Sequence, residues 1–89
     1  MQVRPLSQKL LKYIKDHNLE NKFKKQLFRF QCNPRHPSLN TELLEPKHRR
    51  IYSFRLDRKY RVIFVITNSE AEIIDINDHY RQIQDWLRK

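Results

Sequence analysis

The clearest pattern of apolar and polar positions lies between residues 51 and 80. Residues 52–56 alternate aromatic or aliphatic side chains with polar ones, which is the period of a strand with one buried face. Residues 60–67 form an almost continuous apolar run rich in β-branched side chains, as in a central strand, and residues 71–76 supply a third strand. Short stretches rich in Asp, Asn and Ser favour turns between them. The pattern predicts a three-stranded antiparallel meander.

Two segments before the meander have the apolar spacing of amphipathic helices. One begins after Ser7, a favoured N-cap residue, and extends to about Asn18, while the other covers about residues 19–31. Residues 3–6 favour a short edge strand, and residues 78–89 favour a terminal helix. The elements together predict an α+β fold, in which an N-terminal helix hairpin packs on a twisted, mainly antiparallel sheet of about four strands.

A long connection, residues 33–50, joins the second predicted helix to the meander. It contains three prolines and no apolar periodicity, and a loop of this length in a compact domain is either functional or disordered. The chain of 89 residues is long enough for one domain and too short for two. We therefore expect a single domain over residues 1–89.

Positive charge is concentrated in the first two thirds of the chain. The net charge is +9; residues 1–61 contain 16 Lys and Arg against 5 Asp and Glu, whereas residues 62–89 contain 3 against 5. A basic surface of this kind favours a polyanionic partner, such as a nucleic acid or a strongly acidic protein.

Several classes of site are excluded or disfavoured by composition. Cys32 is the single cysteine, so we expect a small buried residue and no disulfide, and His17, His36 and His48 lack metal-ligand spacing. The chain has no glycine, which excludes Gly-rich phosphate loops. We expect no metal and no small-molecule cofactor. No apolar stretch resembles a membrane span or a secretory signal, so we expect a cytoplasmic protein.

The first candidates for chemistry are two arginines on neighbouring predicted strands. If a three-residue turn covers residues 57–59, Arg55 and Arg61 lie opposite each other on one face of the sheet. Two adjacent guanidinium groups repel each other unless an anion lies between them, and their donors suit a phosphate. The alternative is that both side chains point into water.

A histidine and a tyrosine follow directly on the third predicted strand. His79 and Tyr80 would combine a group that titrates near neutrality with a phenolic donor, next to the two arginines. Such a set could cleave a phosphodiester by general acid–base catalysis, with Glu42 or Glu45 as the base. The alternative is a surface histidine and a half-buried tyrosine at the start of a helix.

The order of elements and several motifs resemble the RelE/ParE superfamily of toxins from bacterial type II toxin–antitoxin systems. The resemblance covers nearly the whole chain and is carried by HPSL at residues 36–39, IYSFRL at 51–56, YRVIF at 60–64 and DHY at 78–80. The ending in His-Tyr is similar to the YoeB-like branch of ribosome-dependent mRNA endonucleases. Two departures are Ser53, where RelE has a lysine, and the nine residues that follow Tyr80.

The resemblance implies a fold, an activity and catalytic residues. Arg55 and Arg61 match basic residues of the nuclease members, Glu42 falls where the YoeB-like branch has its catalytic glutamate, and His79 and Tyr80 complete the implied site. The implied reaction is attack by the RNA 2′-hydroxyl on the adjacent phosphate. The alternatives are inhibition of DNA gyrase, as by ParE-like relatives, and non-catalytic binding of nucleic acid.

The resemblance also implies the partners, which are the ribosome with its mRNA and an acidic antitoxin. Lys22, Lys24, Lys25 and the predicted terminal helix are candidates for the antitoxin contact. RNA binding is assigned to basic residues on either side of the first predicted meander strand, namely Lys47, Arg49, Arg50, Arg58 and Lys59.

Of the two arginines, we expect Arg61 to matter more for cleavage, because a central strand holds it rigidly. We also expect its side chain to face away from the core, so that its removal leaves the fold intact.

Overall fold

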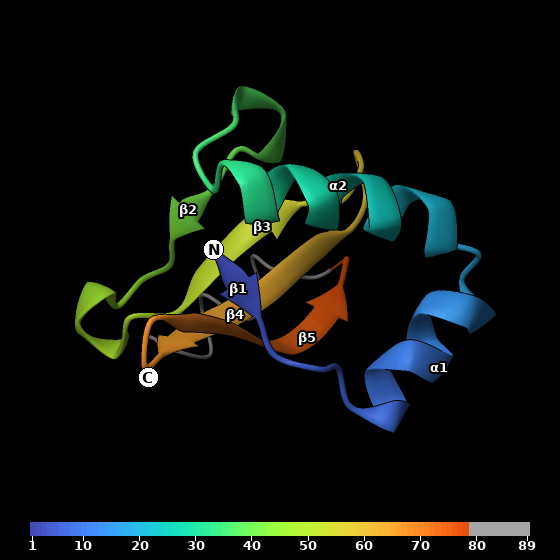
Figure 1. Ribbon diagram of the computed structural model, residues 1–89, viewed down its shortest axis with the longest axis horizontal. Coiled ribbons are helices and arrows are strands. Elements are labelled where there is room, and N and C mark those ends of the chain that lie inside the picture. The colour runs from blue at the N-terminus through green and yellow to red at the C-terminus, as the bar shows by residue number, and fades with distance from the viewer. Residues whose placement is uncertain (79–89) are drawn as a thin grey trace.

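The computed structural model describes residues 1–78, and these form two helices and five strands in an α+β arrangement (Figure 1). The predicted terminal helix, His79 and Tyr80 lie outside the described residues. The helices and strands are β1 (Gln2–Val3), α1 (Gln8–Asp16), α2 (Glu20–Cys32), β2 (Glu42–Leu43), β3 (Tyr52–Arg55), β4 (Arg61–Thr67) and β5 (Glu70–Asn77). Two 3₁₀ turns, η1 (Pro37–Leu39) and η2 (Lys47–Arg49), flank β2.

The strands form one mixed sheet in the order β1-β5-β4-β3-β2. The predicted meander is confirmed as β3, β4 and β5, and β1 adds to its far edge in parallel with β5. The described sheet has five strands instead of about four, because the connection before the meander contains β2. This strand of two residues pairs antiparallel with β3 and was missed because it is too short to show a period.

The helices cover one face of the sheet, with α2 lying across it in Figure 1. The Ser7 hydroxyl accepts a hydrogen bond from the Leu10 amide at 3.2 Å, which confirms the predicted N-cap of α1. On α2, Phe23 and Phe30 are buried, as the apolar spacing predicts. Cys32, at the end of α2, is exposed, so its predicted burial is wrong: it falls on the solvent side of the last turn.

Three phenylalanines form the centre of the core between α2 and the sheet. The Phe30 ring stacks on Phe54 with centroids 4.8 Å apart and meets the Phe64 ring edge-on at 4.9 Å. All three side chains are buried. Such aromatic pairs add about 0.5–1.5 kcal/mol beyond the burial of their area, so this cluster fixes where α2 crosses β3 and β4.

An irregularity in β5 changes which residues face the core. Ile63 pairs with Asp75, but the next residue, Phe64, pairs with Ile73, so Ile74 is an extra residue on β5. The bulge lets Ile73 and Ile76 both face the core although they are three positions apart. Strict alternation would have turned one of them toward the opposite face.

The two turns of the meander are built by polar side chains and by positive φ angles. Asn68 and Ser69 have φ angles of 52° and 67°, as the central residues of a tight hairpin require, and they do so in a chain without glycine. In the first turn, Asp57 Oδ1 accepts hydrogen bonds from the amides of Lys59 and Tyr60, both at 2.8 Å. Both predicted turns are confirmed.

Among residues 1–78, no helix is long and apolar enough to cross a membrane.

The Asp57 carboxylate also binds Lys22 Nζ of α2 at 2.8 Å, which connects the first turn to the helix layer. Burial alone would raise the pKa of Asp57, but the hydrogen bonds from Lys22 and from two backbone amides outweigh it and lower the pKa.

The lowered pKa predicts a change of stability with pH. Because the pKa in the folded state lies below the unfolded value of about 3.9, the contribution of Asp57 is fully present above that pH and is lost as the pH falls through the folded pKa. We expect Asp57→Asn, which keeps the oxygen acceptor, to lower the free energy of unfolding at pH 7 by about 0.5–1 kcal/mol. In urea unfolding, the deficit should shrink as the pH falls below about 3.9 and should disappear below the folded-state pKa of Asp57.

Asp16→Asn is the matched control, because Asp16 makes a more exposed ion pair with Lys12, at 3.5 Å on α1. A deficit of equal size and pH dependence in the control would contradict the assignment to Asp57.

Candidate active site

Arg55 and Arg61 are directly paired across β3 and β4, which confirms the register predicted from the three-residue turn. Their side chains therefore lie on one face of the sheet. It is the face opposite the helices, because the alternate residue Phe54 packs in the helix-side core. The two arginines differ in environment: Arg55 is exposed, whereas only 5% of Arg61 is exposed.

The Arg61 guanidinium is held by groups from two segments. Its Nε donates to Ser53 Oγ at 2.9 Å, and its Nη2 donates to the carbonyl oxygens of Asn40 at 2.6 Å and of Ser53 at 3.4 Å. Ser53 is fully buried. The side chain thus connects β4 to β3 and to the segment that leads into β2.

These contacts correct the expectation that Arg61 can be removed without cost to the fold. Arg61 does point away from the helix-side core, but the small Ser53 side chain and the chain at Asn40 enclose it. A buried guanidinium needs such acceptors, because an unpaired charge away from water is costly.

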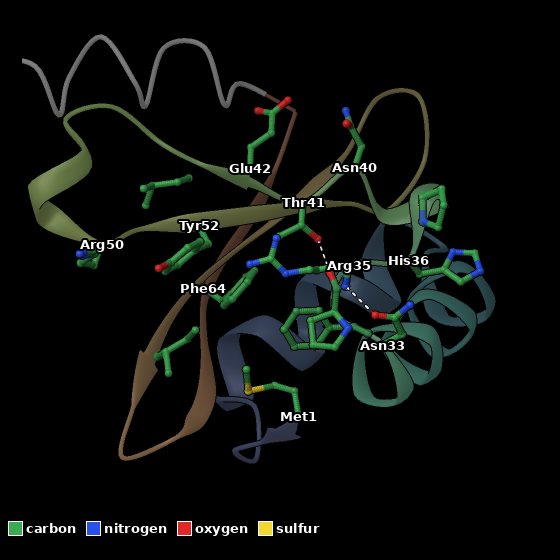
Figure 2. Close-up of a pocket in the computed structure, with 15 residues that line it drawn as sticks. Met1, Asn33, Arg35, His36, Asn40, Thr41, Glu42, Arg50, Tyr52 and Phe64 are labelled. Carbon is green, nitrogen blue, oxygen red and sulfur yellow. Dashed lines mark hydrogen bonds between the residues drawn. The ribbon is translucent and has the colours of Figure 1, made fainter.

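Glu42 lies on the same face of the sheet as the two arginines. It belongs to β2 instead of a loop, and it pairs directly with Ser53, whose hydroxyl binds Arg61. Figure 2 shows the Glu42 carboxylate directed away from Tyr52 and Phe64, which belong to the helix side. Three of the five predicted catalytic residues therefore share one face of the sheet.

The other two predicted catalytic residues, His79 and Tyr80, lie outside the described residues. The strand that leads to them ends beside the arginines, since Asn77 pairs with Arg61. Asp78, the last described residue, lies 3.8 Å from Lys59 Nζ.

A buried glutamine supports Arg55 from the helix side. The Gln26 amide donates to the carbonyl oxygen of Arg55 at 2.8 Å and to that of Ser38 at 3.3 Å, and its oxygen accepts from Arg29 at 3.1 Å. Only 6% of Gln26 is exposed. Sequence reasoning missed it, although a glutamine between Phe23 and Phe30 on an apolar helix face was a visible signal.

The predicted RNA-binding residues fall into two groups at opposite ends of β3 (Figure 1). Lys47, Arg49 and Arg50 precede the strand, and all three are exposed. Arg58 and Lys59 lie in the turn that follows it. The two groups therefore flank the face with the arginines and do not form one cluster.

A cluster of aromatic rings lies beside Lys59 of the second basic group. The Tyr13 ring stacks on His17 with centroids 3.9 Å apart and meets Tyr60 edge-on at 6.3 Å, while Lys59 Nζ lies 5.4 Å above the Tyr60 ring. Burial, together with the negative charge of neighbouring groups, raises the pKa of Tyr13, so its phenol is protonated at neutral pH.

Within the described part of the chain, no group of three or more His, Cys, Asp or Glu side chains could hold a metal ion. His36 is used locally: its Nδ1 accepts from the Ser38 amide at 3.1 Å and lies 2.9 Å from the Ser38 hydroxyl.

The comparisons with known proteins identify the fold. No family model matches the chain. An uncharacterized protein of Haemophilus influenzae is 40% identical over 43 residues, which are 48% of this chain and only 43% of that relative. Two structures of the YoeB–YefM toxin–antitoxin complex of Staphylococcus aureus match with TM-scores of 0.64 and 0.66. The chain has a YoeB-like fold.

The first YoeB–YefM match covers 89% of this chain and 94% of the matched chain, and the second covers 90% and 100%. The identities are 20% and 18%, so the YoeB-like fold is shared although most side chains differ. The fold implied by the resemblance to the RelE/ParE superfamily is thereby confirmed.

The contrast between the two arginines predicts different costs for their removal. Arg61→Ala leaves the buried Ser53 hydroxyl and the Asn40 carbonyl without this donor, and we expect it to lower the free energy of unfolding by about 2–3 kcal/mol. The exposed Arg55→Ala should change it by less than about 0.5 kcal/mol. Urea unfolding of both variants measures the difference. Equal losses of unfolding free energy would contradict the role of Arg61 in holding β3, β4 and the segment before β2 together.

Proposed function

We propose that this protein is the toxin of a type II toxin–antitoxin system and acts as a ribosome-dependent mRNA endonuclease. The YoeB-like fold and the basic surface both support the proposal. The observation that carries it is the strand register, which gives Glu42, Arg55 and Arg61 one common face of the sheet.

In the proposed reaction, the RNA 2′-oxygen loses its proton to a base and attacks the adjacent phosphorus. The bond from phosphorus to the 5′-oxygen then breaks, leaving a 2′,3′-cyclic phosphate, and an acid protonates the departing 5′-oxygen. Glu42 or His79 is the proposed base, and His79 or Tyr80 is the proposed acid. The product termini distinguish this route from attack by water, which leaves no cyclic phosphate.

The two arginines have different roles in this proposal. Arg55 is exposed and can approach the phosphate, so it would stabilise the charge that develops in the transition state. Arg61 is engaged by Ser53 and by the Asn40 carbonyl, so it would act mainly by holding β3, β4 and the approach to β2 in place. Arg55 therefore replaces Arg61 as the residue most important for the chemical step.

The basic residues at the two ends of β3 would bind the RNA backbone on either side of the reacting phosphate. Lys47, Arg49 and Arg50 are exposed at one end, and Arg58 is exposed at the other. Because such contacts release counterions, the binding of RNA should weaken steeply with salt.

Addition of purified protein to translating ribosomes tests the activity. Message cut in the ribosomal A site, with 2′,3′-cyclic phosphate ends, is the expected result. Intact message together with inhibited supercoiling would identify a gyrase inhibitor instead. Salt-sensitive RNA binding without cleavage and without toxicity on expression would identify a binding protein.

The assigned roles predict the behaviour of single variants. Arg55→Ala should lower the single-turnover rate on ribosome-bound message by about a hundred- to a thousandfold, the cost of losing one transition-state donor, at unchanged thermal stability. Glu42→Gln should lower the rate if the carboxylate is the base. His48→Ala is the control, because His48 is exposed on η2 and has no assigned role. A near-parental rate for Arg55→Ala would remove it from the site.

The proposed neutralising partner is an acidic antitoxin. Lys24 and Lys25 are exposed on α2, whereas Lys22 of the same helix is already bound to Asp57 at 2.8 Å. We expect Lys24→Glu/Lys25→Glu to weaken the binding of the cognate antitoxin at least about tenfold, with most of the change in the dissociation rate. Unchanged affinity in a titration of the two purified proteins would place the contact elsewhere.

A further inference from the structure

A pocket opens on the helix side of the sheet, away from the face that carries Arg55 and Arg61. Its volume is about 850 Å³. It is lined by the end of α2 and the loop after it, by the segment leading into β2, and by helix-side residues of β3 and β4. The lining residues include Arg35, Leu43, Arg50, Tyr52, Phe64 and Ile66.

The charges around this pocket are predominantly positive. Arg35 and Arg50 line it, and within residues 1–78 neither has a carboxylate at ion-pair distance. Figure 2 shows them on opposite sides of Tyr52 and Phe64, with the Arg35 side chain extending toward the rings. Among residues 1–78, Glu42 is the single acidic residue that lines the pocket, and its carboxylate points away from the rings (Figure 2).

Two hydrogen bonds hold the loop that carries Arg35. The Arg35 amide donates to Asn33 Oδ1 at 3.1 Å, and Thr41 Oγ1 donates to the Pro34 carbonyl at 2.7 Å across the loop. A preformed wall lowers the conformational cost of binding.

The apolar lining of the pocket combines aliphatic and aromatic side chains. Ile66 is 43% exposed and Leu43 is partly exposed. The Tyr52 ring is already stacked on Phe64, with centroids 5.4 Å apart and planes at 18°, and Phe64 is 2% exposed. Phe64 thus covers one face of the Tyr52 ring, and Ile66 and Leu43 add aliphatic contacts to a pocket that contains two cations.

We propose that this pocket binds an acidic peptide segment of a protein partner, with carboxylates on Arg35 and Arg50 and an aliphatic side chain between them on Ile66 and Leu43. In an extended peptide, residues two apart share a face, so the sequence acid-x-leucine-x-acid presents the matching pattern. The proposal rests on the pocket's own charges and lining, and it does not depend on the nuclease activity.

The probe is a synthetic peptide of about eight residues with the core Asp-Ser-Leu-Ser-Asp, long enough for one extended recognition segment. It is titrated into ¹⁵N-labelled protein and followed by amide chemical shifts. The expected shifts lie at Arg35, Leu43, Tyr52 and Ile66. Shifts confined to the Arg55 and Arg61 face would overturn the proposal.

Matched charge reversals test the two cations. The double variant Arg35→Glu/Arg50→Glu should bind the peptide at least about tenfold more weakly, because two ion pairs are lost and repulsion is added. Lys9→Glu/Lys15→Glu makes the same charge change at exposed positions of α1 and should keep the affinity within about threefold, the effect of the net charge alone. Equal weakening by both would reveal only non-specific attraction and overturn the proposal.

Two further probes test the nature of the ligand. Replacement of the peptide's leucine by serine should weaken binding several-fold, because the contact with Ile66 is lost. A single-stranded RNA or inorganic phosphate that shifts the same amides at lower concentration than the peptide would overturn the proposal, because it would identify a phosphate site.

Discussion

The buried Arg61 guanidinium is the contact on which the geometry of the candidate catalytic face depends. Its donors reach the Ser53 hydroxyl and the Asn40 carbonyl, so β3, β4 and the segment leading into β2 meet at one side chain. A buried charge with incomplete partners is costly, and the free energy rises sharply if any one segment moves away. Arg61 thus fixes the relative positions of Glu42 and Arg55. These two residues lie on the short strands β2 and β3, which have few backbone hydrogen bonds of their own to fix their positions.

Gln26 performs the corresponding task from the helix side. Its amide binds the Arg55 carbonyl, while its oxygen accepts from Arg29, so a buried side chain of α2 holds the end of β3. The side chain of Arg55 is therefore exposed, while its backbone carbonyl is held by a hydrogen bond from Gln26. An exposed functional side chain on a rigid backbone is the arrangement expected for a preorganised charge.

The sequence allowed prediction of those features that depend on local pattern. The meander, the cap at Ser7 and the pairing of Arg55 with Arg61 follow from alternation, hydrogen-bonding residues and turn length. Features set by tertiary contact were missed. The strand Glu42–Leu43 is too short to have a period, and the bulge at Ile74 depends on how β5 meets β4.

The candidate site shows the same division. Which residues share a face could be predicted from the register, but which arginine is exposed could not. Arg61 is buried because its neighbour on the face is the small Ser53 and because Asn40, distant in sequence, supplies a carbonyl. Neither contact produces a periodic pattern in the sequence. The position of Arg35 in the pocket could not be predicted either, because Arg35 lies in a loop without apolar periodicity.

The alternation of β3 explains how a small sheet can present a candidate catalytic face on one side and a candidate binding pocket on the other. Ser53 and Arg55 face the candidate catalytic side, while Tyr52 and Phe54 face the helix side, where Tyr52 lines the pocket. Glu42 is shared, because it belongs to the candidate catalytic face and also lines the pocket, whereas Arg55 and Arg61 do not line it. The face and the pocket are also mechanically close, because Tyr52 is adjacent to Ser53, whose hydroxyl holds Arg61. A ligand that displaces the Tyr52 backbone would therefore disturb the Arg61 contacts, whereas one that binds only side chains would leave them intact.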